Sequence, residues 1–105
     1  MFSTTGYLVA KPGMENNLKT YVEKFGSSPN IVSICLSKID SDKNDFTEFI
    51  IWVDKNAHDE TTSQPEFPAV YQELLDLLAD EPAWYSGEMI YESFSATRSQ
   101  LGHTN

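Results

Sequence analysis

The chain has 105 residues, of which 40% are hydrophobic, and this suits a single domain over residues 1–105 with one core. Sixteen acidic residues against seven Lys and Arg give a formal net charge of −9, and the resulting field repels phosphate backbones and anionic lipids. We therefore expect neither nucleic acid nor a membrane as a partner.

The N-terminus and the single cysteine limit the expected cellular setting. Residues 1–6 have neither the cationic start nor the long apolar run of a signal peptide, and no stretch reaches transmembrane length. The default expectation is a cytoplasmic protein. Cys35 has no second cysteine for a disulfide or a CxxC metal site, so we expect a small core residue there and no bound metal.

The first part of the sequence predicts a strand followed by a helix. Residues 7–10 form a short apolar run, which stops where residues 11–13 open a turn with Pro and Gly. Large apolar residues then recur at helical spacing over 14–25, and Gly26 ends the pattern. The apolar positions of this amphipathic helix are Met14, Leu18, Tyr21, Val22 and Phe25.

The next segment predicts an antiparallel hairpin. Val32, Ile34 and Leu36 alternate with small side chains, as on a strand whose larger aliphatic residues face the helices. The polar residues 40–45 form the turn, and a third strand follows over 46–53.

This third strand is apolar on both faces. Phe46, Ile50 and Trp52 fall on one face, and Phe49, Ile51 and Val53 fall on the other. One face can cover the helices, but so short a chain has no second layer for the other face. We therefore expect a second copy of the chain or a ligand to cover it.

The remaining sequence completes a recognisable order of elements. A short polar helical turn is expected over 57–64, a main helix over about 68–79 and a final strand over 84–94. Residues 95–105 are mostly polar and are expected to form a tail or an arm on a partner subunit. The order β-α-β-β-α-β is typical of an α+β, ferredoxin-like fold, with an antiparallel sheet and helices on one face.

Four short segments add to this pattern. They are Lys11-Pro12-Gly13 after the first strand, Trp52-Val53-Asp54 at the end of the hairpin, Asn56-Ala57, and Pro65-Glu66-Phe67. In order and spacing, over roughly residues 5 to 94, they resemble the antibiotic biosynthesis monooxygenase family. The resemblance implies a homodimer that forms a dimeric α+β barrel with a pocket in each subunit. Characterised members include oxygenases of polycyclic aromatic phenols, quinol monooxygenases and haem-degrading enzymes.

Two positions depart from the family's pattern. The family often has an acidic residue two positions before the Trp of the third strand, where this chain has Ile50. It often has a His four residues after the Ala of the helix start, where this chain has Thr61. His58 comes one residue after Ala57, so we expect it to point elsewhere, as a solvated surface side chain.

The haem-degrading branch is disfavoured by three positions. Its members resemble one another in an Asn on strand one, a Trp at the start of helix two and an iron-binding His along that helix. This chain has Gly6, Thr61 and Tyr71 at those places. Without the axial His, a haem would lack its usual ligand.

The phenol-oxidising branch needs less from the protein. An electron-rich hydroquinone, once deprotonated, can pass an electron to dioxygen without flavin or metal, so no cofactor is expected. The pocket must hold the substrate between apolar walls, accept its proton and stabilise negative charge on its oxygen. We expect Trp52, Phe67 and Tyr91, with Trp84, to supply walls, and Thr61 to supply a hydroxyl group.

Two residues are candidates for the catalysis itself. Tyr71 lies on the second helix, where some family members place a pocket Tyr, and could donate a proton to the substrate oxygen or relay one from it. Glu48 shares a strand face with Ile50 and Trp52, and burial of that face would raise its pKa and make it a candidate base. The simpler interpretations are a core Tyr with a solvated hydroxyl group and a solvated carboxylate at the barrel rim.

The sequence thus favours a cofactor-independent monooxygenase of a small aromatic phenol or quinol. A non-catalytic dimeric barrel that binds a small hydrophobic molecule would use the same walls without a base, and it is the main alternative. An isomerase or decarboxylase would need a His or a carboxylate pair converging in the pocket, and the sequence places no such pair.

Overall fold

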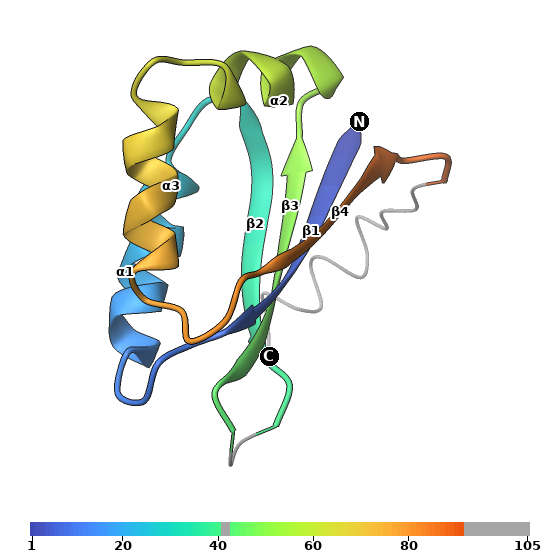
Figure 1. Ribbon diagram of the computed structural model, residues 1–105. Coiled ribbons are helices and arrows are strands. Elements are labelled where there is room, and N and C mark those ends of the chain that lie inside the picture. Colours follow the sequence, from blue (N-terminus) through green and yellow to red (C-terminus); the bar gives the residue numbers. More distant parts are fainter. Residues whose placement is uncertain (41–42, 92–105) are drawn as a thin grey trace, which may run out of the picture.

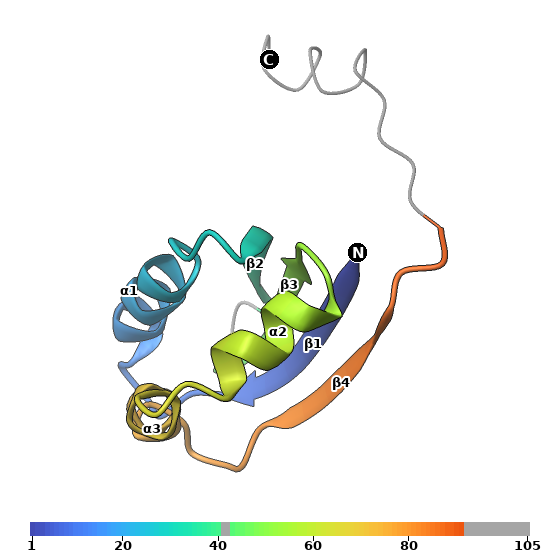
Figure 2. The same cartoon turned by 90° about the horizontal axis from the view of Figure 1, so that it is seen from above.

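The fold is a four-stranded antiparallel sheet with three helices on one side (Figures 1 and 2). The computed structural model describes residues 1–40 and 43–91. The strands are β1 (Phe2–Val9), β2 (Ile31–Lys38), β3 (Asp45–Trp52) and β4 (Ala83–Glu88), in the sheet order β2-β3-β1-β4. The helices are α1 (Glu15–Phe25), α2 (Lys55–Thr62) and α3 (Phe67–Leu75). The predicted α+β ferredoxin-like fold is confirmed.

Strand β1 is longer than its apolar run indicated. It begins at Phe2, five residues before the predicted start, and pairs with β3 on one side and β4 on the other. Phe2 and Thr4 are both buried, because alternate residues of this central strand face the helices. Thr4 is a polar residue whose hydroxyl group is hydrogen-bonded inside the core, so the hydrophobic pattern could not reveal this part of the strand.

Strand β2 contains a bulge that corrects one prediction. Ile31 pairs with Trp52 and Ser33 pairs with Ile51, so Val32 is an extra residue on β2. The bulge turns Val32 outwards, where it is exposed, and brings Ile31 against the core instead. Ile34 beyond the bulge packs on the core as predicted.

Strand β3 follows the predicted alternation of faces. Phe46, Ile50 and Trp52 are buried on the inner face, which packs against the helices. Phe49 and Val53 are exposed on the outer face. Cys35 is also exposed, opposite Phe49 in the neighbouring strand, so the prediction of a core cysteine was wrong.

The structure confirms two separate helices after the hairpin, but the residues at which they begin and end differ from the predicted ones. Asp54 caps α2, and its side chain accepts a hydrogen bond from the Ala57 backbone N–H at 2.7 Å. Helix α3 ends at Leu75, before the predicted residue 79, because Leu78 forms a β-bridge with Ala10. Strand β4 ends at Glu88, so the predicted strand over 84–94 was wrong for residues 89–91, which are described and lie outside the strand. Residues 92–94 and the predicted tail 95–105 lie outside the described residues.

The core lies between the inner sheet face and the helices. Leu8, Leu18 and Leu74, from β1, α1 and α3, are almost completely buried at its centre. A second cluster of Phe2, Ile50 and Trp52 lies beneath the end of the sheet where α2 packs. No helix within the described residues is long and apolar enough to cross a membrane.

Candidate functional site

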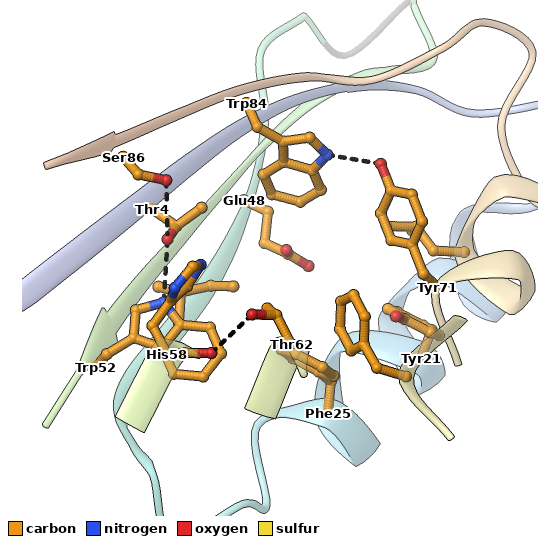
Figure 3. A pocket seen from close by; sticks show the side chains of 13 residues that line it. Thr4, Tyr21, Phe25, Glu48, Trp52, His58, Thr62, Tyr71, Trp84 and Ser86 are labelled. Carbon is orange, nitrogen blue, oxygen red and sulfur yellow. Dashed lines mark hydrogen bonds between the residues drawn. The ribbon is translucent and has the colours of Figure 1, made fainter. Parts of the chain in front are cut away.

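A cavity of about 240 Å³ lies between the inner sheet face and all three helices. Its sheet wall consists of Thr4, Glu48, Ile50, Trp52, Trp84 and Ser86. Its helix wall consists of Tyr21, Phe25, His58, Thr62, Phe67, Tyr71 and Leu74. Aromatic side chains therefore form most of the walls, and a few polar groups project between them (Figure 3).

Glu48 is the ionisable group in the sheet wall of this cavity. It is only 2% exposed, and its carboxylate points into the space between Trp84 and Thr62 (Figure 3). Within the described part of the chain, its Oε2 atom has no hydrogen-bond partner. Burial raises the pKa of Glu48 to about 7, since the charged form loses its hydration there. The carboxyl group can therefore both hold and release a proton near neutral pH.

Trp84 and Tyr71 form a hydrogen-bonded pair beside Glu48. The indole Nε1 of Trp84 donates to the Tyr71 hydroxyl oxygen at 2.9 Å. An indole N–H is only a donor, so Tyr71 accepts this bond and keeps its own proton for another partner. Tyr71 also stacks on Phe67, with ring centroids 5.9 Å apart, and this holds the phenol ring in the wall.

Gly6 makes room for this pair. In the sheet register Gly6 lies between Trp84 on β4 and Glu48 on β3. A Cβ atom at Gly6 would lie 2.4 Å from Cζ3 of Trp84, far inside contact distance. The missing side chain therefore lets the indole lie across β1 on its way to Tyr71.

Trp52, Thr4 and Ser86 form a second hydrogen-bonded cluster farther along the sheet. The Trp52 indole Nε1 donates to the Thr4 hydroxyl oxygen at 3.1 Å, and the Ser86 hydroxyl group approaches the same oxygen at 3.5 Å. Trp52 is nearly completely buried, so this bond satisfies an indole N–H that has no access to water. Figure 3 shows these three residues on the side of the cavity opposite Tyr71.

Tyr21 closes the cavity from α1. Its ring stacks on Phe25 with centroids 6.1 Å apart. Burial, and then the charge of Glu48, raise the pKa of the Tyr21 hydroxyl group, so it stays protonated. Tyr21 is thus a neutral wall residue that can donate a hydrogen bond.

No family model matches the sequence, and no curated protein sequence does. Solved structures do match. A putative antibiotic biosynthesis monooxygenase from Deinococcus radiodurans has a TM-score of 0.71 and 15% identity, over 90% of this chain and 97% of its own. A mutant of SnoaB, a cofactor-independent oxygenase from Streptomyces nogalater, has a TM-score of 0.70 and 17% identity, over 87% and 94%. This chain has the fold of the antibiotic biosynthesis monooxygenases. At these identities the likeness shows the fold alone.

The resemblance noted in the sequence is therefore confirmed at the level of the fold. A third structure, a putative antibiotic biosynthesis monooxygenase from Nitrosomonas europaea, covers 87% of this chain and 100% of its own, with a TM-score of 0.67 and 13% identity. In each case nearly the whole of the other chain is matched, so the likeness is not confined to one motif of the sheet.

Most of the predicted site residues meet in the cavity. The structure brings together Glu48, Trp52, Phe67, Tyr71 and Trp84. The burial of Glu48 places it on the inner face rather than at a solvated rim. Among the described residues there is no group of three or more His, Cys, Asp or Glu side chains that could hold a metal ion.

Two predicted site residues lie away from the cavity. Thr61 donates to the backbone carbonyl of Ala57 at 2.9 Å and accepts from Asn30 Nδ2 at 3.1 Å, so its hydroxyl group serves the helix and a neighbouring loop. Tyr91 follows β4 and is 81% exposed, outside the cavity of its own chain. Neither residue lines the cavity in this structure.

His58 and Thr62 occupy the place that was expected for Thr61. The prediction that His58 is a solvated surface residue was wrong, because its side chain is 23% exposed and its ring lines the cavity. The ring packs edge-on against Trp52, with centroids 5.1 Å apart. His58 and Thr62 are four residues apart, so both lie on one face of the helix, and the sequence alone could have indicated that they face the same way.

Proposed function

We propose that the protein is a cofactor-independent monooxygenase of a small phenol or hydroquinone. The observation that supports this most directly is the buried carboxyl group of Glu48, with one oxygen unpartnered among the described residues, in an aromatic cavity. Its pKa of about 7 suits a general base at neutral pH. A substrate hydroxyl group would donate a hydrogen bond to this oxygen, Oε2 of Glu48.

In this reaction the substrate itself supplies the electrons. Glu48 removes a proton from a hydroxyl group, and the resulting phenolate passes one electron to dioxygen. The two radicals then combine at a ring carbon, and cleavage of the O–O bond leaves one oxygen atom on the ring and releases the other as water. For a hydroquinone the sum is hydroquinone plus dioxygen giving hydroxyquinone plus water, so dioxygen is the only oxidant required.

The other cavity residues have distinct parts in this proposal. Tyr71 keeps its own proton because its oxygen accepts from Trp84, so it can donate to the substrate oxygen as negative charge develops. The rings of Trp52 and Phe67 hold the flat substrate between apolar surfaces and exclude water. The cavity volume, about 240 Å³, lies just below the usual range for ligand pockets and favours substrates of one or two rings.

We also propose that the protein acts as a homodimer joined through the outer face of the sheet. One row of that face crosses all four strands and includes Tyr85 on β4, Phe49 on β3 and Cys35 on β2. Tyr85 is 69% exposed, and Tyr7 and Val53 are also exposed on this side. Large apolar side chains gathered on one sheet face are best covered by another sheet.

The cysteine is consistent with action in the cytoplasm. Cys35 is a free thiol and is exposed on the outer face of β2. Exposed thiols persist most readily in a reducing compartment. We therefore propose the cytoplasm as the site of action.

Oxygen consumption with purified protein and a panel of hydroquinones, without added metal or flavin, tests the proposal. We expect uptake above the autoxidation background. Glu48→Gln keeps the size of the side chain but cannot accept the proton, so it should lower the rate by about 10²-fold or more. Glu23→Gln, an exposed carboxylate on α1, is the matched control and should leave the rate unchanged.

Two outcomes would contradict the proposal. Equal rates in the native protein and Glu48→Gln would remove Glu48 from the chemistry. No uptake with any compound, together with a thermal shift on adding the same compounds under anaerobic conditions, would favour a non-catalytic binding protein with the same walls.

A further inference from the structure

The walls of the cavity contain a buried carboxyl group but no lysine or arginine among the described residues that line it. Glu48 is 2% exposed and points into the cavity, and its Oε2 atom has no hydrogen-bond partner within the described part of the chain (Figure 3). The other titratable side chains in the walls are Tyr21 on α1, His58 on α2 and Tyr71 on α3. A ligand in the cavity therefore meets an acidic group that no permanent positive charge in the walls balances.

The His58 ring has an acidic partner of its own. Its Nδ1 atom lies 2.9 Å from Oδ1 of Asp59. The hydrogen bonds from Lys55 and then from His58 lower the pKa of Asp59, so this carboxylate is ionised. A positive charge on the imidazole would therefore be paired with Asp59 on the same helix.

The rest of the cavity wall is rich in aromatic rings. Two helices and two strands contribute them, as Tyr21, Phe25, Phe67, Tyr71, Trp52 and Trp84. The face of an aromatic ring attracts a cation, most strongly when the ring is an indole. In the sheet register Gly6 lies between Trp84 and Glu48, so no side chain separates the indole from the carboxyl group in that row. One small ligand can therefore contact both groups.

A positively charged ligand suits this arrangement better than a neutral or a negative one. The free protein already bears the cost of removing Glu48 from water, so a cation adds only its own desolvation. A charge-assisted hydrogen bond to the carboxylate and contact with the ring faces offset that desolvation. The net charge of −9 also attracts cations to the protein as a whole.

We propose that the cavity binds small aromatic ammonium ions, with the ammonium group on the Glu48 carboxylate and the ring system between the aromatic walls. This inference goes beyond the proposed oxygenation and does not depend on it. The ammonium group donates a hydrogen bond to Oε2, and its ring system takes the place of a phenol. Ligands that carry a carboxylate or a phosphate are excluded, because they bring a like charge to Glu48.

Calorimetry with ligands that share one ring system tests the inference without turnover. The probes are 1-naphthylmethylammonium, 1-naphthylmethanol and 1-naphthoate, which differ in the charge of one small group. At pH 8, above the pKa of about 7 that burial gives Glu48, the ammonium ion should bind about tenfold more tightly than the alcohol. The carboxylate should not bind measurably. Glu48→Gln should bind the ammonium ion no better than the alcohol, whereas Glu23→Gln, exposed on α1, should keep the preference.

Proton release provides a second measurement that needs no variant. At pH 6 most of the Glu48 carboxyl group is protonated, and a bound cation favours its ionised form. Binding of the ammonium ion should therefore release about one proton, and binding of the alcohol should release none. Calorimetry at pH 6 in buffers of different ionisation enthalpy measures this release.

Three results would overturn the inference: an alcohol bound as tightly as the ammonium ion, a Glu48→Gln variant that keeps the preference, or ammonium binding without proton release. The proposed oxygenation is judged separately. Ammonium preference in a protein that consumes no oxygen with any hydroquinone would overturn the oxygenation and leave the cation site. Oxygen uptake without ammonium preference would leave the oxygenation and overturn the cation site.

Discussion

Gly6 is important because it has no Cβ atom. Its Cα lies under the Trp84 indole, and that indole holds the Tyr71 hydroxyl group at 2.9 Å. Any Cβ here forces the indole away from β1, since the contact at 2.4 Å is with the ring itself. Gly6 therefore controls how close the Trp84 and Tyr71 pair comes to Glu48.

Replacing Gly6 gives a direct test of this packing. Gly6→Ala should destabilise the protein by about 1–3 kcal/mol through overpacking and should weaken binding of aromatic ligands as the indole moves. Gly87→Ala, also on the sheet and with nothing within 4 Å of the new Cβ, should stay within roughly 0.5 kcal/mol of native. For each variant, urea unfolding measures the stability and intrinsic Trp fluorescence measures the binding of aromatic ligands. Equal stability and ligand affinity in the two variants would show that Trp84 is not held as described.

The sequence pointed to Glu48 as a carboxyl group on a buried strand face, but it did not predict which face of α2 turns towards the cavity. Glu48 was recognisable because it is a polar residue on an otherwise apolar strand face. If that face is buried, the polar group is buried with it. His58 was missed because α2 is short and polar, so no apolar stripe fixed which of its faces turns inwards. Thr61 was predicted to line the cavity in place of Thr62 for the same reason, because the sequence did not show which face of α2 turns inwards.

At the scale of elements, strong hydrophobic periodicity predicted most of the structure. The alternation on β3 and the helical repeat of α1 each match an observed buried face. The predictions failed where pairing, rather than pattern, decides the outcome. The bulge at Val32 arises from the register with β3, and the early end of α3 arises from the bridge between Leu78 and Ala10. Neither partner is visible from the local sequence.

For the whole molecule, the main prediction is the covering of the outer sheet face. Phe49→Asp places a charge in the middle of that face, and burying it between two copies without a partner should weaken the dimer by at least about a hundredfold. Asn17→Asp adds the same charge on an exposed position of α1 and should leave the dimer intact. Sedimentation velocity at micromolar concentration measures both. A monomeric native protein would contradict the assembly, as would a Phe49→Asp variant that stays dimeric.

The cavity lies on the inner side of the sheet, and the exposed apolar residues of the proposed dimer interface lie on its outer face. The proposed catalytic site and the proposed dimer interface are therefore separate. The cavity is lined by the inner residues of β1, β3 and β4, while the outer residues of the same strands form the patch. Because strand residues alternate between faces, a change on one face leaves the other chemically intact. We therefore expect Phe49→Asp to affect assembly before it affects ligand binding.

The role of Glu48 as the base is tested by the pH dependence of kcat/KM for oxygen uptake with 1,4-dihydroxynaphthalene. Glu48 must be ionised to accept a proton, and burial raises its pKa to about 7, so the native rate should rise with pH and level off above about pH 7. Burial raises the pKa of the Tyr21 hydroxyl group, so Tyr21 should stay protonated over this range. Glu48→Gln should show only the autoxidation background. A native profile that is flat below pH 7, or a Glu48→Gln profile with the same rise, would contradict the account.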